Sequence, residues 1–280
     1  MTTTTEQVRY SAASPAEAPY LRAERKLRTV ACYGTIALLM FGPLAFGAVE
    51  AWSTLVLELG SAAVFALWVV SRLAASRPSL HLRIVHLPPM LFLALVGVQL
   101  IFGTTAYRYL TVTEFLKYVA YALVFFIATD LFRTDREMRR LCLALAAFGF
   151  AMAVFGCLQQ FTSDEKLYWT RTPRFGGAVY GPYVNRNHYA GLMELLIPFA
   201  LVGSFKLDLS ASKRVVLGFA TVLMTTTIFL CQSRGGMVAF ALQCVFVAVV
   251  LLVRSRSTVP ALTVTCALLL TVGLGLWLSS

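Results

Sequence analysis

Residues 175–196 read FGGAVYGPYVNRNHYAGLMELL and carry a polar motif between two long apolar runs. Positions 185–188 (Asn-Arg-Asn-His) place two amides, a guanidinium and an imidazole side by side, directly before the second of these runs. A shorter polar stretch, residues 233–236 (Ser-Arg-Gly-Gly), precedes another apolar run. We interpret the two stretches as the starts of two membrane helices, because most of the remaining chain consists of apolar runs.

These runs predict an all-α, polytopic membrane protein. Of the 280 residues, 59% are hydrophobic and 13% are charged, whereas a soluble domain carries about 25% charged residues. A membrane helix needs about 20 predominantly apolar residues, and about nine runs reach or approach this length. Their limits are 30–49, 52–71, 86–103, 111–131, 141–161, 188–204, 215–231, 235–253 and 259–278.

The distribution of Lys and Arg orients the helices. With a cytoplasmic N-terminus and alternating spans, most of the 24 Lys and Arg residues fall in cytoplasmic segments, as the positive-inside rule requires. Topology thereby explains the net charge of +11, and no nucleic-acid partner is expected. We predict a cytoplasmic, disordered tail over 1–29 and a transmembrane domain over 30–280 with a periplasmic C-terminus. Because the chain stops directly after a hydrophobic run, we expect a fragment or a short form of a longer protein.

Several basic residues break this charge bias together, in the predicted outer loop 162–187. One interpretation is that the outer face binds an anionic ligand, with Arg171 and Arg174 among the binding residues. Long loops often carry function. The alternative is a solvated loop whose charges are balanced by Asp164 and Glu165. The basic residues of this loop are Lys166, Arg171, Arg174 and Arg186.

Spans 188–204 and 235–253 both begin on the outer side in this topology. The N-terminus of a helix carries roughly half a positive charge and free N–H groups, so it attracts anions. Arg186 and Arg234 lie at the two starts, where an arginine opposes the helix dipole at a cost of a few tenths to about 1 kcal/mol. An anion bound between them would offset that cost.

The residues around the two arginines fit the same interpretation. Asn185 or Asn187 is a suitable N-cap for the first helix, and Ser233 for the second. Gly235 and Gly236 have no side chains, so a ligand or another helix can approach the backbone closely. The sequence therefore predicts one polar pocket formed by both helix starts.

Phosphate is the anion that suits this pocket best. Guanidinium groups make bidentate bonds to phosphate oxygens, and arginine stays protonated at all working pH values. A lipid diphosphate in the outer leaflet would present its phosphates at this depth. If a glycan is cut from that diphosphate, the positioned arginines would stabilise the charge of the leaving group without a metal.

Two titratable residues near the pocket have open roles. His188 is a candidate general base for an acceptor hydroxyl, or else a hydrogen-bonding residue that fixes the loop. Glu194 lies at membrane depth and is a functional candidate for that reason, or else it forms an internal salt bridge with Arg234 or Lys117. Glu114 and Lys117 are three residues apart and are expected to pair with each other.

No cofactor is expected. The six cysteines lie in apolar runs without a C-x-x-C pair, and we interpret them as packing residues. With one outer histidine and no cysteine near it, the sequence argues against a zinc site. A magnesium site through Asp164 or Glu165 is a weaker alternative.

At these residues the chain resembles the O-antigen ligase and polymerase superfamily of bacterial membrane glycosyltransferases. The resemblance is carried by residues 181–191 (GPYVNRNHYAG), by 233–236 (SRGG), and by 43–47 (PLAFG) followed by Trp52. It implies transfer of a glycan from undecaprenyl diphosphate to an acceptor at the periplasmic face of the bacterial inner membrane. The acceptors of the family are lipid A core sugar, a growing polysaccharide or a protein hydroxyl.

The resemblance also implies site residues. Family members are usually metal-independent and use periplasmic arginines and a histidine in a large periplasmic loop. Arg234 matches one such arginine in position, and Arg186 is the counterpart of another in role. The large loop normally follows about where this chain stops, so its histidine has no counterpart here unless His188 substitutes for it.

Two other classes of function compete with glycan transfer. A transporter for an anionic solute would need a polar path through the spans, and few charges lie in mid-span. A non-catalytic membrane subunit is favoured if the protein ends at Ser280. A further segment with a polar loop, a histidine and more spans would favour the enzyme.

Overall fold

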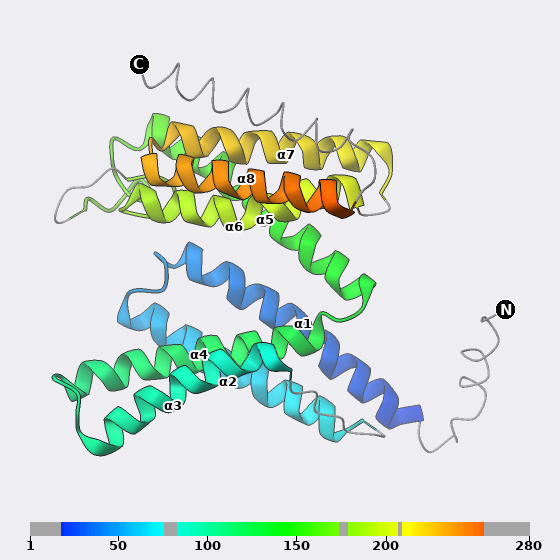
Figure 1. The fold of residues 1–280 in the computed structure, drawn as a ribbon, viewed down its shortest axis with the longest axis vertical. Coiled ribbons are helices and arrows are strands. Elements are labelled where there is room, and N and C mark those ends of the chain that lie inside the picture. The colour runs from blue at the N-terminus through cyan, green and yellow to red at the C-terminus, as the bar shows by residue number, and fades with distance from the viewer. Residues whose placement is uncertain (1–17, 76–82, 174–178, 207–208, 255–280) are drawn as a thin grey trace. The chain divides into compact units, whose positions relative to one another are not determined.

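The computed structural model describes residues 18–75, 83–173, 179–206 and 209–254, and in this part of the chain helices are joined by turns and loops, with no strand (Figure 1). Each helix coincides with one of the apolar runs, because a backbone in apolar surroundings must satisfy its hydrogen bonds internally. The elements are α1 (Ala18–Leu44), α2 (Ala51–Leu73), η2 (Ile84–His86), α3 (Leu87–Phe102), α4 (Arg108–Leu131), α5 (Asp135–Thr162), α6 (Arg186–Lys206), α7 (Ala211–Leu230) and α8 (Arg234–Arg254).

The helices coincide with the first eight predicted spans, and the ninth, 259–278, lies outside the described residues. Helix α1 begins at Ala18, so the tail that we predicted to be disordered to residue 29 is helical from Ala18 onward. The basic segment from Arg22 to Arg28 is therefore the first part of a helix that continues into the apolar run.

Within the described residues, six helices are long and apolar enough to cross a membrane, as expected of a multi-pass membrane protein. Helix α6 is not among them, since it begins with polar residues and contains Glu194, and the apolar part of α8 is shorter. The six are Arg22–Leu44, Ala51–Leu73, Ile84–Phe102, Arg108–Leu131, Asp135–Thr162 and Ala211–Leu230.

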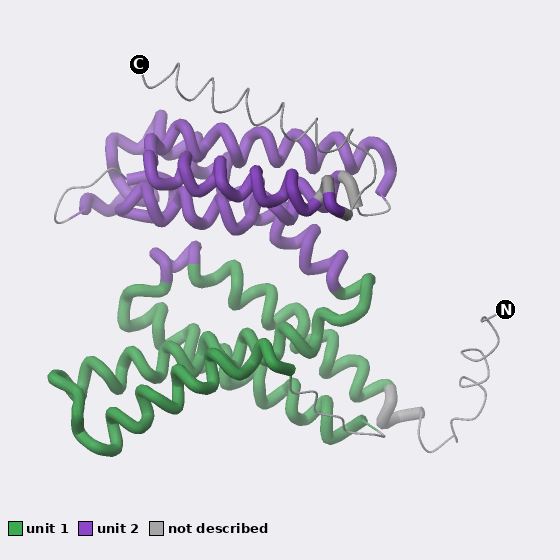
Figure 2. Tube along the Cα trace, in the orientation of Figure 1, with its two compact units in different colours: residues 1–42, 48–137 green, residues 43–47, 138–280 purple. Residues whose placement is uncertain are grey.

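The chain divides into two compact units (Figure 2). Unit 1 comprises residues 1–42 and 48–137, and unit 2 comprises residues 43–47 and 138–280. In unit 1, α4 packs against both α2 and α3. Helix α3 has no buried residue among its described positions, so its apolar surface is suited to lipid.

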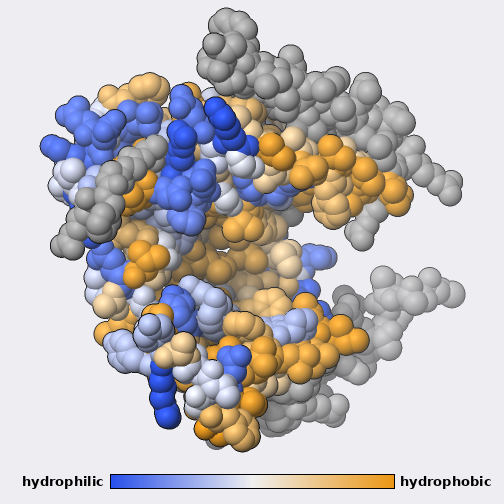
Figure 3. Space-filling view, turned by 60° about the vertical axis from the view of Figure 1, so that its left-hand side comes forward, coloured by the Kyte–Doolittle hydropathy of each residue, from blue (hydrophilic) through white to orange (hydrophobic). Residues whose placement is uncertain are grey.

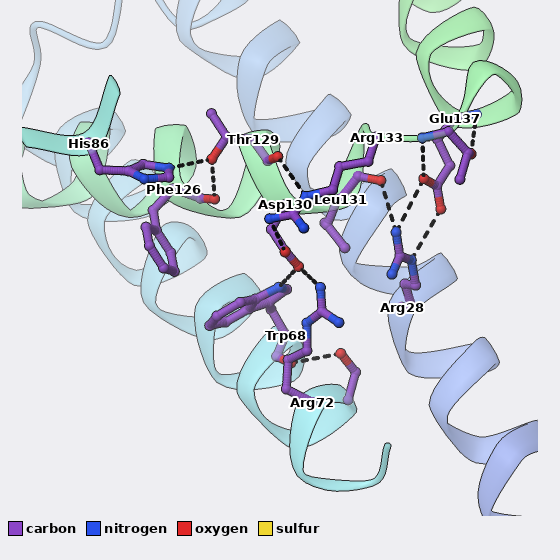
Figure 4. Close-up of polar contacts among 12 residues, drawn as sticks. Arg28, Trp68, Arg72, His86, Phe126, Thr129, Asp130, Leu131, Arg133 and Glu137 are labelled. Atoms are coloured by element: carbon purple, nitrogen blue, oxygen red, sulfur yellow. Dashed lines mark hydrogen bonds and ion pairs between the residues drawn. The ribbon is translucent and has the colours of Figure 1, made fainter. Parts of the chain in front are cut away.

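One end of unit 1 contains a buried ionic network around Asp130 (Figure 4). Asp130 is 5% exposed and stands near the end of α4. Its Oδ2 accepts hydrogen bonds from Nε1 of Trp68, at 2.8 Å, and from Nη2 of Arg72. Its Oδ1 pairs with Nη2 of Arg133 at 2.8 Å. The carboxylate therefore joins the end of α2 to the end of α4.

Two further contacts extend the polar end of unit 1 (Figure 4). Arg28 of α1 makes a bidentate pair with Glu137, with Nε–Oε1 and Nη2–Oε2 distances of 3.1 and 3.2 Å. The backbone N–H of Arg83 donates to Nδ1 of His86 at 3.0 Å, so Nε2 carries the hydrogen that faces the Thr129 hydroxyl at 2.8 Å. These bonds tie α1 and the start of α3 to the same end.

In unit 2, α6 packs against both α7 and α8. Its buried face includes Met193 and Ile197, which are at most 2% exposed, and Met224 and Ile228 of α7 are fully buried. Hydrophilic residues gather at the end of unit 2 where α6 and α8 begin, while apolar residues cover the helices beside it (Figure 3). That end contains the predicted site.

Candidate functional site

The first arginine-bearing helix start is capped by Asn185. Helix α6 begins at Arg186, and Oδ1 of Asn185 accepts the backbone N–H of Asn187 at 2.9 Å. The Asn185 carbonyl accepts the N–H of His188 at 3.0 Å. Of the two asparagines that the sequence offered as caps, the structure therefore uses Asn185. Asn187 is left with a side chain that can bond elsewhere.

The second helix start is capped by Ser233, as predicted. Its Oγ accepts the backbone N–H of Gly236 at 3.1 Å, and its hydroxyl donates to Oδ1 of Asn187 at 2.8 Å. Ser233 is 1% exposed. One buried hydroxyl thus caps α8 and binds the first turn of α6, so the two helix starts lie side by side at the same end of unit 2.

Gly236 allows the two helices to approach this closely. A Cβ atom at Gly236 would lie 2.5 Å from Cβ of Ala190 in α6 and 3.2 Å from Oε1 of Glu194, whereas a Cβ at Gly235 would meet nothing within 4 Å. The predicted close approach is confirmed for Gly236, with another helix as the neighbour. Gly235 faces open space.

This difference gives a stability prediction with a matched control. Gly236→Ala should lower the free energy of unfolding by about 1–3 kcal/mol, the usual cost of overpacking, because Ala190 would have to move. Gly235→Ala should stabilise the protein by about 0.4–1 kcal/mol through reduced backbone freedom of the unfolded chain. Thermal unfolding of the purified protein in detergent measures both, and equal shifts would show that the helices are not in close contact.

Helix α5 binds the described part of the loop that leads into α6, residues 163–173 and 179–185. Nε2 of Gln159 donates to the carbonyl of Gly181 at 2.8 Å, where the backbone is left-handed at φ 56°. The rings of Tyr180 and Tyr189 are 4.6 Å apart and at most 2% exposed. The sequence did not indicate the roles of Gln159, Tyr180 and Tyr189, because their contacts join residues that are far apart in the chain.

The turn at residues 43–47 also belongs to this end of unit 2. The Tyr168 hydroxyl donates to the carbonyl of Leu44 at 2.6 Å, and the rings of Tyr168 and Phe46 pack edge to face at 5.3 Å. The guanidinium of Arg171 lies 5.2 Å from the centre of the Phe46 ring. The turn at 43–47, which is one of the stretches that carry the family resemblance, is therefore in contact with the loop that follows α5.

A cavity of about 150 Å³ opens beside Arg186. Of the predicted catalytic and substrate-binding residues, Arg186 alone lines this cavity. Arg234, which the sequence placed in the same pocket, does not line it, nor do His188 and Glu194. The lining combines one cation, one carboxylate, hydroxyl and amide groups, and apolar side chains. It consists of Gln160, Ser163, Glu165, Val179, Tyr180, Arg186, Leu230, Cys231 and Gln232.

The remaining predicted residues differ in exposure. Arg186 is half-buried, whereas His188 and Arg234 are exposed, with the His188 ring 6.1 Å from that of Tyr183. Within the described residues, Glu194 forms no ion pair with Arg234.

Of the two remaining predicted positions, the structure describes Lys117 but not Arg174. Lys117 pairs with Glu114 at 2.7 Å, as predicted. Arg174 lies outside the described residues.

The phenols of the loop remain protonated at neutral pH. Burial raises the pKa of Tyr183 to about 12 and also raises the pKa values of Tyr168 and Tyr180. At neutral pH these hydroxyls can therefore donate hydrogen bonds. Among the described residues, no group of three His, Cys, Asp or Glu side chains is placed to hold a metal ion.

Comparison of the chain with protein families, with curated proteins and with solved structures finds no match.

Proposed function

We propose that this protein transfers a glycan from undecaprenyl diphosphate to an acceptor hydroxyl, as O-antigen ligases and polymerases do. The observation that carries the proposal is the hydrogen bond between Asn187 and Ser233, which joins the two arginine-bearing helix starts. The bond supports the proposal because it brings together the helix starts that carry Arg186 and Arg234, although Arg186 alone of the two lines the cavity.

The chemistry follows from charge. Two helix N-termini contribute N–H groups and partial positive charge to one place, and two guanidinium groups add full charges. In the proposed reaction the diphosphate leaves the anomeric carbon of the glycan and gains negative charge. Preorganised cations that face this charge lower the barrier, and Arg186 and Arg234 would supply them.

The proposal includes the location and the partners that the resemblance implies. The reaction takes place at the periplasmic face of the bacterial inner membrane, where the lipid diphosphate is held in the outer leaflet. The acceptor is lipid A core or a growing surface polysaccharide. Membrane lipids surround the apolar helices. The exposed positions of Arg234 and His188 leave that end of unit 2 accessible to both substrates.

The test uses cells whose own copy of the gene carries Arg186→Ala or Arg234→Ala, so that neither substrate has to be known beforehand. We expect surface polysaccharide to be lost and undecaprenyl diphosphate-linked glycan to accumulate, while the variant protein still reaches the membrane. Arg214→Ala is the control, because Arg214 is an exposed arginine near the start of α7. Unchanged polysaccharide in both arginine variants would refute the proposal.

A further inference from the structure

The proposed transfer needs a base for the acceptor hydroxyl, and the cavity beside Arg186 contains a carboxylate. Glu165 lines this cavity together with Arg186, whereas His188, the candidate base named from the sequence, does not. A general base must lie within hydrogen-bond reach of the proton that it removes. Glu165 is therefore placed to reach a hydroxyl bound in the cavity, whereas His188 is not.

The cavity has the size and lining of a sugar subsite. A closed cavity of about 150 Å³ accommodates one benzene ring, so a volume of about 150 Å³ that is open to one side is suited to a single six-membered ring. Amide groups of Gln160 and Gln232 and the Ser163 hydroxyl can bond sugar hydroxyls. Val179 and Leu230 provide apolar contact for a ring face.

Tyr180 independently indicates that this cavity binds a polar ligand. It is 2% exposed and lines the cavity, yet among the described residues the neighbouring Cys157 thiol, a weak hydrogen-bonding group, is the only group placed to bond its hydroxyl. Buried polar groups nearly always have a partner, and an unpaired one carries the cost of its lost hydration. A sugar hydroxyl in the cavity would provide a stronger acceptor than the Cys157 sulfur.

The backbone around Glu165 adopts an uncommon conformation. Asp164 and Glu165 are consecutive non-glycine residues in the left-handed region, with φ values of 47° and 61°. Such residues persist only where the surroundings hold them, and they cluster at functional sites. Here the turn is closed by the bond from the Lys166 N–H to the Ser163 carbonyl, at 2.9 Å. The strained turn keeps the Glu165 side chain at the cavity.

We propose that this cavity binds the terminal sugar of the acceptor and that Glu165 is the catalytic base. The inference rests on the proposed function. The acceptor oxygen forms a bond to the anomeric carbon of the donor glycan as the bond from that carbon to the diphosphate oxygen breaks. The hydroxyl proton passes to the Glu165 carboxylate and then to water, and the electron pair leaves with undecaprenyl diphosphate.

The first test measures glycan transfer in membranes of cells that carry variants of Glu165. Glu165→Gln and Glu165→Ala should lower the turnover rate by about 10²–10⁴-fold, the usual contribution of a general base, with little change in the KM for the lipid-linked donor. Asp164→Asn is the matched control, since Asp164 shares the turn and is not among the cavity-lining residues. It should keep nearly full activity.

Chemical rescue separates a catalytic role from a structural one. Sodium formate supplies a small carboxylate and should restore part of the activity of Glu165→Ala, whereas sodium chloride at the same ionic strength should not. Activity in Glu165→Gln equal to that of the unaltered protein, with Arg234→Ala inactive, would overturn the inference and leave the proposed function in place. Failure of formate to rescue Glu165→Ala would also overturn the assignment of Glu165 as the base.

A second test reads sugar binding without any transfer assay. Saturation-transfer NMR of the purified protein with D-glucose, D-galactose and N-acetyl-D-glucosamine should give a signal for at least one of these probes. Val179→Trp, which fills the cavity, should remove that signal, and Arg214→Ala should not. If glycan transfer survives both arginine replacements, the proposed function fails. If no probe gives a signal that depends on Val179, the sugar subsite fails by itself.

Discussion

Replacing Arg186 and Arg234 together by alanine should reduce glycan transfer by about 10⁴-fold, and either single replacement should cost about 10²–10³-fold, the range found for removal of one charge-stabilising donor. The reason is that both guanidinium groups are placed at helix starts that share the Asn187–Ser233 hydrogen bond. Because both would act on the same diphosphate charge, the two effects need not add. Initial rates of glycan transfer, in membranes that contain equal amounts of each variant protein, measure these losses.

Lysine variants refine the prediction. Arg186→Lys and Arg234→Lys keep the charge but lose the planar, bidentate donor set, so they should retain more activity than the alanine variants and less than the unaltered protein. Arg214→Ala should have no effect. A double alanine variant with more than a tenth of the original rate would contradict the assignment of both arginines, whatever the single variants show.

The two helix starts were predictable because their signals are local. An asparagine or serine before an apolar run predicts an N-cap, and the structure confirms this for Asn185 and Ser233. A similar signal at residues 134–137 (Thr-Asp-Arg-Glu) has the form of a capping box, and Thr134 and Glu137 do cap α5 reciprocally. The eight described helices followed from apolar length for the same reason.

The cavity was not predictable from local patterns. It forms where the end of α5, the loop and the ends of α6 and α7 meet, and its lining includes residues far apart in sequence, such as Gln160 and Gln232. Glu165 was considered only as a counter-charge or a metal ligand, because nothing in a sequence shows that this carboxylate and Arg186 line the same cavity. Loop conformation depends on tertiary contacts, here those of Gln159 and Tyr180.

The network around Asp130 was missed for a related reason. Arg72 and Arg133 are what the positive-inside rule expects at helix ends, so their charges had an explanation before any partner was known. The structure shows that the two guanidinium groups bind one carboxylate that is 5% exposed. Arg72 and Arg133, whose charges already fit the membrane topology, therefore also contribute to the packing of unit 1.

Asp130→Ala should be among the most destabilising single replacements in unit 1. It leaves Arg72, Arg133 and the Trp68 indole N–H without their shared acceptor. Breaking a buried ion pair on one side costs about 3–5 kcal/mol. We expect about 2–3 kcal/mol, a loss below that range, because Arg72 and Arg133 keep 19% and 24% of their side-chain surface exposed. Thermal unfolding in detergent, followed by tryptophan fluorescence, measures the loss.

A second replacement distinguishes the ionic network from simple loss of packing. Arg72→Met combined with Asp130→Ala removes a stranded cation along with its partner, so the double variant should be more stable than Asp130→Ala alone, as expected for coupled neighbours. Asp135→Asn is the matched control, since Asp135 is an exposed acid in the first turn of α5 and should cost only a few tenths of a kcal/mol. The single variant Arg72→Met completes the comparison. If the losses of unfolding free energy in Arg72→Met and Asp130→Ala simply add in the double variant, charge does not hold the ends of α2 and α4 together, and shape alone must account for their contact.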